Sequence, residues 1–148
     1  MKANLCPTNE TIWVTGASSG IGKQLAINLA KGGNHVIVTA RNVEALNELA
    51  RHYPGIQVLD VDISDSGSVE LMANKLRTFT PVIDRVILNA GVCEYFDVNK
   101  PDWGMMARAM SVNYLGAVHC LAAALALLKR SARGHIVAMA SQASRVPV

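Results

Sequence analysis

The most informative segment of this chain is TGASSGIG, residues 15–22. It lies between an apolar run at residues 11–14, typical of a strand, and a segment at residues 19–31 with Ile21, Leu25 and Leu29 at helical spacing. Glycine lets the chain turn sharply and lets a ligand approach the backbone. The N–H groups and the dipole at a helix start favour an anion. The pattern predicts a cradle for the pyrophosphate of a dinucleotide; an ordinary strand–helix turn is the alternative.

The composition fits one globular enzyme-like domain. Hydrophobic residues make up 51% of the 148 residues and charged residues 17%, which permits a real core and argues against disorder. The net charge is only +3 and the basic residues are scattered, so we expect no nucleic-acid partner.

Cysteine usage and hydropathy bear on the compartment. Cys6, Cys93 and Cys120 are far apart, suit no metal site and fit a reducing cytoplasm. The first residues lack the apolar core of a signal peptide. The longest apolar run, residues 117–128, contains His119 and is too short to span a bilayer. We therefore expect a cytoplasmic protein with no membrane contact and no bound metal.

Strand-like and helix-like segments alternate along the chain. We expect strands at residues 11–14, 35–39, 56–61, 84–88 and 135–140. We expect helices at residues 19–31, from 42 onward, at 66–79 and at 101–130, the last in two segments near Val112. Nearly continuous apolar strands are typical of a parallel sheet covered on both faces. The alternation predicts an α/β fold, a doubly wound parallel sheet whose ligands lie beyond the C-terminal strand ends.

Further short motifs follow the glycine stretch in a fixed order. They are Asp-Ile-Ser-Asp at residues 62–65, Asn-Ala-Gly at residues 89–91, Asn113 in the long helix and Ser141 after the fifth strand. Together they make the sequence resemble the short-chain dehydrogenase/reductase family, in the subgroup whose glycine motif reads TGxxxGIG. The resemblance implies a Rossmann-type sheet truncated after strand five, with residues 1–148 forming a dinucleotide-binding domain that is incomplete at its C-terminal end.

The end of the second strand bears on the choice of cofactor. An acidic residue there would bind the ribose 2′-hydroxyl of NAD, but this sequence has Ala40 and Arg41. An arginine can pair with a 2′-phosphate through charge-assisted hydrogen bonds. We therefore expect NADP, as NADPH, rather than NAD; the alternative is that Arg41 is an ordinary solvated arginine.

The resemblance implies a cofactor site drawn from four segments of the chain. Its expected members are Gly16, Ser18, Ser19, Gly20, Ile21, Gly22, Arg41, Asp62, Ile63, Asn89, Ala90 and Gly91. In the family the aspartate accepts a bond from the adenine amino group, and the Asn-Ala-Gly segment runs beside the ribose. A plain loop-capping role is the alternative for Asp62, and Leu88 stands where many members have a second asparagine.

The resemblance also implies catalytic roles for Asn113 and Ser141. Asn113 would be a buried amide that needs partners and orders a water in a proton relay; it could instead satisfy only local backbone. Ser141 would hold and polarise the substrate carbonyl, unless it is a generic serine after a strand.

The family's general acid/base is a tyrosine followed four residues later by a lysine, because tyrosine has an ordinary pKa of about 10 and needs a nearby cation. None of Tyr53, Tyr95 and Tyr114 has that lysine, so we expect the pair beyond Val148. The expected function is an NADP-dependent oxidoreductase that moves hydride between nicotinamide and a small-molecule carbonyl or alcohol. This chain would be its cofactor-binding portion, inactive alone, in a homo-oligomer. The alternative is a non-catalytic nucleotide-binding or interaction module.

Overall fold

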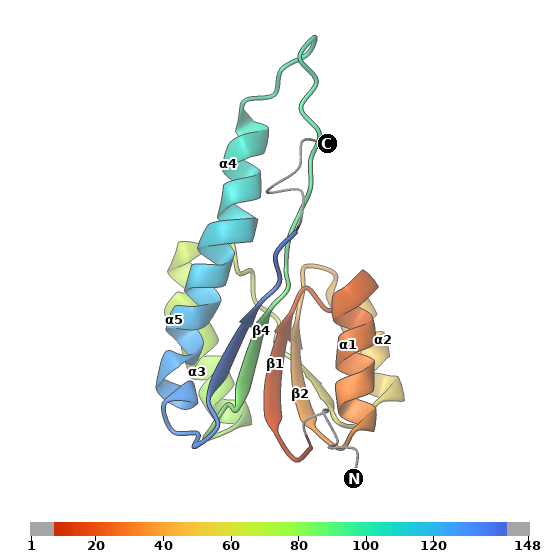
Figure 1. Ribbon diagram of the computed structural model, residues 1–148, viewed down its shortest axis with the longest axis vertical. Helices are drawn as coiled ribbons and strands as arrows, with labels where there is room; N and C mark the ends of the chain where they lie inside the picture. Colours follow the sequence, from red (N-terminus) through yellow and green to blue (C-terminus); the bar gives the residue numbers. More distant parts are fainter. Residues whose placement is uncertain (1–7, 142–148) are drawn as a thin grey trace.

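The computed structural model describes residues 8–141 and contains one five-stranded parallel sheet (Figure 1). The strand order is β3-β2-β1-β4-β5. The strands are β1 (Thr11–Thr15), β2 (His35–Thr39), β3 (Ile56–Val58), β4 (Arg85–Leu88) and β5 (His135–Ala138). The predicted Rossmann-type, doubly wound α/β fold is confirmed, because crossover connections carry helices to both faces of the sheet.

Alternate residues of the central strands feed two separate cores. Ile12 and Val36 pack with α1 (Gly20–Lys31) and α2 (Val43–His52) on one face. Trp13 and Ile37 pack with α3 (Val69–Phe79) and α5 (Gly116–Leu128) on the other face. A short 3-10 turn, η1 (Ser66–Ser68), leads into α3. Burial on both faces explains why these strands are apolar throughout.

Two strands end earlier than expected. β3 ends at Val58 rather than at residue 61, and β5 ends at Ala138 rather than at residue 140. The backbone N–H of Leu59 still donates to Val38 at 2.9 Å, but β2 ends at Thr39 and offers the chain no further partner. The residues after β3 therefore leave the sheet edge.

The long helix begins at Gly104, later than the expected residue 101, and runs to Leu128. Asp102 fixes this start, since its Oδ1 accepts a hydrogen bond from the Gly104 N–H at 2.9 Å. The expected division near Val112 is present as a π-helical turn, η2 (Ser111–Leu115), between α4 (Gly104–Met110) and α5. Such turns occur often at functional sites.

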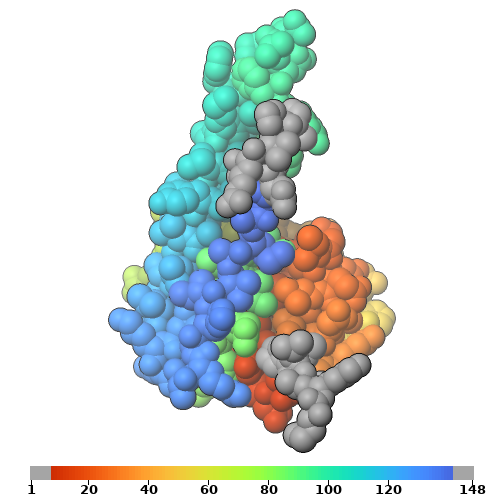
Figure 2. Space-filling model, viewed as in Figure 1, coloured from red at the N-terminus to blue at the C-terminus, as the bar shows by residue number. Residues whose placement is uncertain are grey.

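The two ends of this helix have different surroundings. The α5 segment packs against α3 and buries Cys120, Ala124 and Leu127 in the core. The α4 segment extends past the sheet and forms, with the chain before it, the projection in Figures 1 and 2. The whole helix, 25 residues, is long and apolar enough to cross a membrane by length and composition, although the apolar run considered in the sequence was too short.

Candidate functional site

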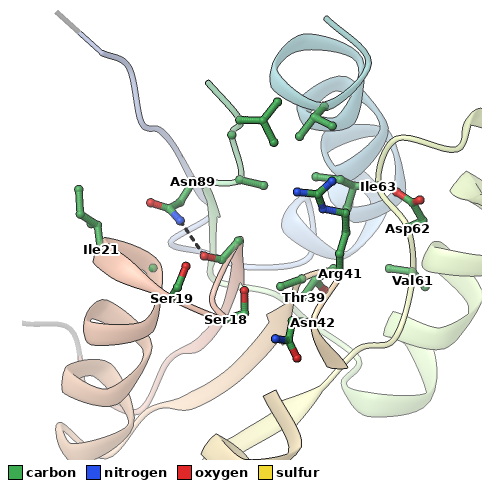
Figure 3. Close-up of a pocket in the computed structure, with 17 residues that line it drawn as sticks. Ser18, Ser19, Ile21, Thr39, Arg41, Asn42, Val61, Asp62, Ile63 and Asn89 are labelled. Atoms are coloured by element: carbon green, nitrogen blue, oxygen red, sulfur yellow. Dashed lines mark hydrogen bonds between the residues drawn. The ribbon is translucent and has the colours of Figure 1, made fainter. Parts of the chain in front are cut away.

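A cavity of about 420 Å³ lies at the C-terminal edge of the sheet, where β1, β2 and β4 end (Figure 3). It is lined by Gly16, Ser18, Ser19, Ile21, Gly22, Thr39, Ala40, Arg41, Asn42, Val61, Asp62, Ile63, Asn89, Ala90, Gly91, Val92 and Val112. Every residue of the expected cofactor set except Gly20 lines this one cavity. The structure thus brings together four segments that are far apart in sequence.

The glycines of the loop after β1 are needed for different physical reasons. Gly16 has φ +71°, and a Cβ on it would come within 2.7 Å of the Ala90 Cα. A Cβ on Gly22 would overlap the Gly16 carbonyl oxygen and the Asn89 amide. Gly20 has φ +54° but open space around it. Packing excludes a side chain at the first two positions, whereas backbone conformation favours glycine at the third.

Thr15 and Asn89 join the glycine loop to the end of β4. The Thr15 hydroxyl oxygen accepts hydrogen bonds from the backbone N–H groups of Asn89 and Ala90, both at 3.0 Å. The Asn89 amide donates to the carbonyl oxygen of Thr15 at 3.0 Å. It also donates to the carbonyl oxygen of Gly16 at 3.2 Å, the bond that is dashed in Figure 3. Asn89 therefore holds the cavity floor in a fixed shape.

Two charged side chains, Arg41 and Asp62, line the cavity. Arg41 follows β2, is exposed and lines the cavity near Asp62 (Figure 3). The Oδ1 of Asp62 accepts hydrogen bonds from the Ser64 hydroxyl and N–H at 2.7 and 2.9 Å. These bonds, with the Arg41 guanidinium, lower the pKa of Asp62. The carboxylate is therefore ionised at neutral pH. Its Oδ1 caps the loop at Ser64, as the alternative interpretation of the sequence expected.

A second hollow of about 430 Å³ adjoins the first and shares Arg41, Asp62, Val92 and Val112 with it. Arg108 lies here and pairs with Glu94 at 2.6 Å and with Asp102 at 2.7 Å. Hydrogen bonds from Arg108 lower the pKa of both carboxyl groups. The cluster ties the segment after β4 to α4, and sequence reasoning missed it because its members show no shared spacing.

Asn113 and Ser141 are not among the residues that line the cavity. Asn113 is exposed rather than buried, because η2 lies beyond the sheet edge, and its amide is engaged with the backbone of Val92. Its Oδ1 accepts from the Val92 N–H at 2.7 Å and its Nδ2 donates to the Val92 carbonyl at 2.9 Å. Ser141 is exposed and follows β5 at the same edge of the sheet. The expected catalytic roles of both residues stay predictions.

Other residues that sequence reasoning missed lie beside those it found. Thr39, Ala40, Asn42 and Val61 flank the expected residues in sequence, so proximity alone could have found them. Val92 and Val112 carry no polar signal, and only the approach of η2 to the segment after β4 makes them wall residues. Within residues 8–141, no group of three or more His, Cys, Asp or Glu side chains could hold a metal ion.

Comparison with known proteins places this chain among dehydrogenases. The family model described as short chain dehydrogenase matches residues 10–148. Dehydrogenase/reductase SDR family member 7B of Mus musculus is 28% identical over 148 residues, which are 95% of this chain and 46% of that protein. An oxidoreductase of Staphylococcus epidermidis is 33% identical over 132 residues, 86% of this chain and 56% of its own length.

Solved structures agree. A short chain dehydrogenase from Escherichia coli CFT073, complexed with NADPH, matches with a TM-score of 0.88 and 28% identity, over 97% of this chain and 63% of that one. The RhlG/NADP active-site complex from Pseudomonas aeruginosa matches with a TM-score of 0.85 and 25% identity, over 95% and 58% of the two chains. The present chain spans about half the length of the curated relatives it matches.

Proposed function

The chain belongs to the short-chain dehydrogenase family, and from that premise we propose that it is the NADP-binding portion of an oxidoreductase. The reaction would move hydride between nicotinamide and a small-molecule carbonyl or alcohol. The observation that carries the choice of NADP is the position of Arg41, two residues after the end of β2 and in the cavity wall. The ribose 2′ position is expected beside this point, and a guanidinium pairs with phosphate bidentately.

The residues of the cavity fit such a cofactor. Gly16 and Gly22 pack the loop closely against the segment that follows β4, and the start of α1 offers N–H groups to a pyrophosphate. Ser19 caps α1 without a side-chain hydrogen bond to the helix, which leaves its hydroxyl for a phosphate oxygen. Asp62 lines the cavity as a carboxylate held by Ser64, suited to accept a bond from an amino group.

The cofactor, when bound, supplies the hydride. We assign to Ser141 the task of donating a hydrogen bond to the substrate oxygen, since it follows β5 at the edge where the cavity opens. We assign to Asn113 a positioning role, because both ends of its amide are bonded to Val92, a wall residue of the cavity. In this proposal Asn113 fixes the position of Val92, and the cavity wall at Val92 binds the water of the proton relay.

The test is a calorimetric titration with NADPH and NADH. We expect tighter binding of NADPH, and Arg41→Ala should cost about 1.5–3 kcal/mol of NADPH binding, typical of a hydrogen bond to a charged group. NADH binding should change little. Arg51→Ala is the matched control, because Arg51 is also exposed and stands on α2 outside the cavity. Equal weakening of both cofactors by Arg41→Ala would remove the 2′-phosphate assignment.

A further inference from the structure

The largest fully buried side chain of the described residues, Trp13, carries a polar contact directed at the cavity wall. Trp13 lies in the middle of β1 with no exposed surface, and its indole Nε1–H donates to the Thr39 hydroxyl oxygen at 2.9 Å. In register, Trp13 stands opposite Ile37, so the indole reaches diagonally toward the C-terminal edge of the sheet.

Thr39 connects the glycine loop to the turn formed by Ala40 and Arg41, which we call the Arg41 corner. It is 1% exposed, ends β2 and lines the cavity. Its carbonyl oxygen accepts hydrogen bonds from the N–H groups of Gly16 and Ala17 at 2.7 and 3.3 Å. Ala40 and Arg41 follow it directly. Its backbone therefore fixes the loop, while the indole fixes its side chain.

The core around the indole also reaches a second part of the wall. Trp13 belongs to the same buried cluster as Val61, which lines the cavity after β3. Loss of the bond would leave a buried polar group unsatisfied, which is costly, so the pair has one stable arrangement. A phenylalanine would fill most of the space without donating a hydrogen bond.

We propose that Trp13 is a positioning residue for cofactor selection: through its hydrogen bond to Thr39 it holds the Arg41 corner where a 2′-phosphate is received. The inference rests on the proposed NADP function. It assigns to a core residue, which touches no ligand, an effect on the preference for NADPH over NADH.

The experiment compares dissociation constants for NADPH and NADH in four single variants and one double variant of the chain. Trp13→Phe and Thr39→Val each remove the hydrogen bond, and we expect each to lower the preference for NADPH about fivefold, the equivalent of one neutral hydrogen bond of about 1 kcal/mol. Thr39→Ser keeps the hydroxyl and should keep the preference. Leu76→Ala, in the same buried cluster but outside the cavity, should lower the Tm without changing the preference.

The double variant Trp13→Phe with Thr39→Val should lose no more preference than either single variant, because the two changes break the same bond. If the wild-type chain prefers NADPH and Trp13→Phe preserves that preference while lowering the Tm, the role given to Trp13 is refuted and the proposed function stands. That role is also refuted if Thr39→Ser behaves like Thr39→Val. A wild-type chain that binds neither nucleotide, or binds both equally, refutes the proposed function and this inference with it.

Discussion

Replacing Gly20 and Gly33 separately by alanine distinguishes a backbone effect from a ligand effect. Both glycines have positive φ, +54° and +83°, and a Cβ at either would meet no heavy atom within 4 Å. A residue with a Cβ in the left-handed conformation costs roughly 1–2 kcal/mol. Both variants should therefore lose that stability, and the Tm should fall by about 2–4 °C per kcal/mol for a protein of this size.

The two positions differ in what lies beside them. Gly20 begins α1 between Ser19 and Ile21, which line the cavity, whereas Gly33 precedes β2 at the opposite edge of the sheet. If the loop cradles a pyrophosphate, a methyl group at Gly20 stands between the two residues that line the anion's cavity, and it disturbs the backbone that presents their N–H groups. We expect Gly20→Ala to weaken NADPH binding at least about tenfold, which is about 1.4 kcal/mol, and Gly33→Ala to leave it unchanged.

Thermal unfolding by circular dichroism and titration calorimetry with NADPH measure the two effects independently. Equal losses of Tm with unchanged NADPH affinity in both variants would refute the phosphate cradle. A loss of Tm in only one variant would show that positive φ is not the shared cause of the destabilisation.

Three further outcomes follow from the same residues. The purified 148-residue chain should oxidise no NADPH at 340 nm with a panel of aldehydes and ketones, because none of its tyrosines is followed four positions later by a lysine; turnover proportional to the intact chain would contradict this. Ser64→Ala should raise the pKa of Asp62 in an NMR titration, because the serine hydroxyl lowers it. The variant should be less stable than the wild type above the ordinary aspartate pKa, and this difference should vanish as the pH falls through the pKa of Asp62 in the folded chain. Light scattering should show self-association through the apolar side chains exposed along α4 and α5, and Met110→Lys with Val118→Lys should reduce it; a wild-type monomer at micromolar concentration would count against this.

Much of the fold could be read from local patterns. The turn residues of the glycine loop, the helical spacing of apolar residues and the run of apolar strands depend on neighbours in sequence, and the resulting α/β fold is confirmed. The predicted ends of the strands and helices were less accurate. β3 ends early because β2 ends beside it, and the long helix begins at Gly104, whose N–H donates to the Asp102 side chain. The first boundary depends on a neighbouring strand that is distant in sequence, whereas the second depends on a local hydrogen bond between residues two positions apart.

The candidate site divides in the same way. Local patterns were enough to predict which segments meet at the C-terminal edge of the sheet, because parallel strands bring their ends together whatever side chains they carry. How those segments are held together depends on contacts between residues far apart in sequence, which form only in the folded chain. The Trp13 indole donates to Thr39, 26 residues further along the sequence, and Asn113 bonds with Val92, 21 residues before it. Arg108 gathers Glu94 and Asp102 at the neighbouring hollow. Such contacts leave no periodic trace in the chain, because they depend on distances that exist only once the sheet, its loops and the long helix have packed.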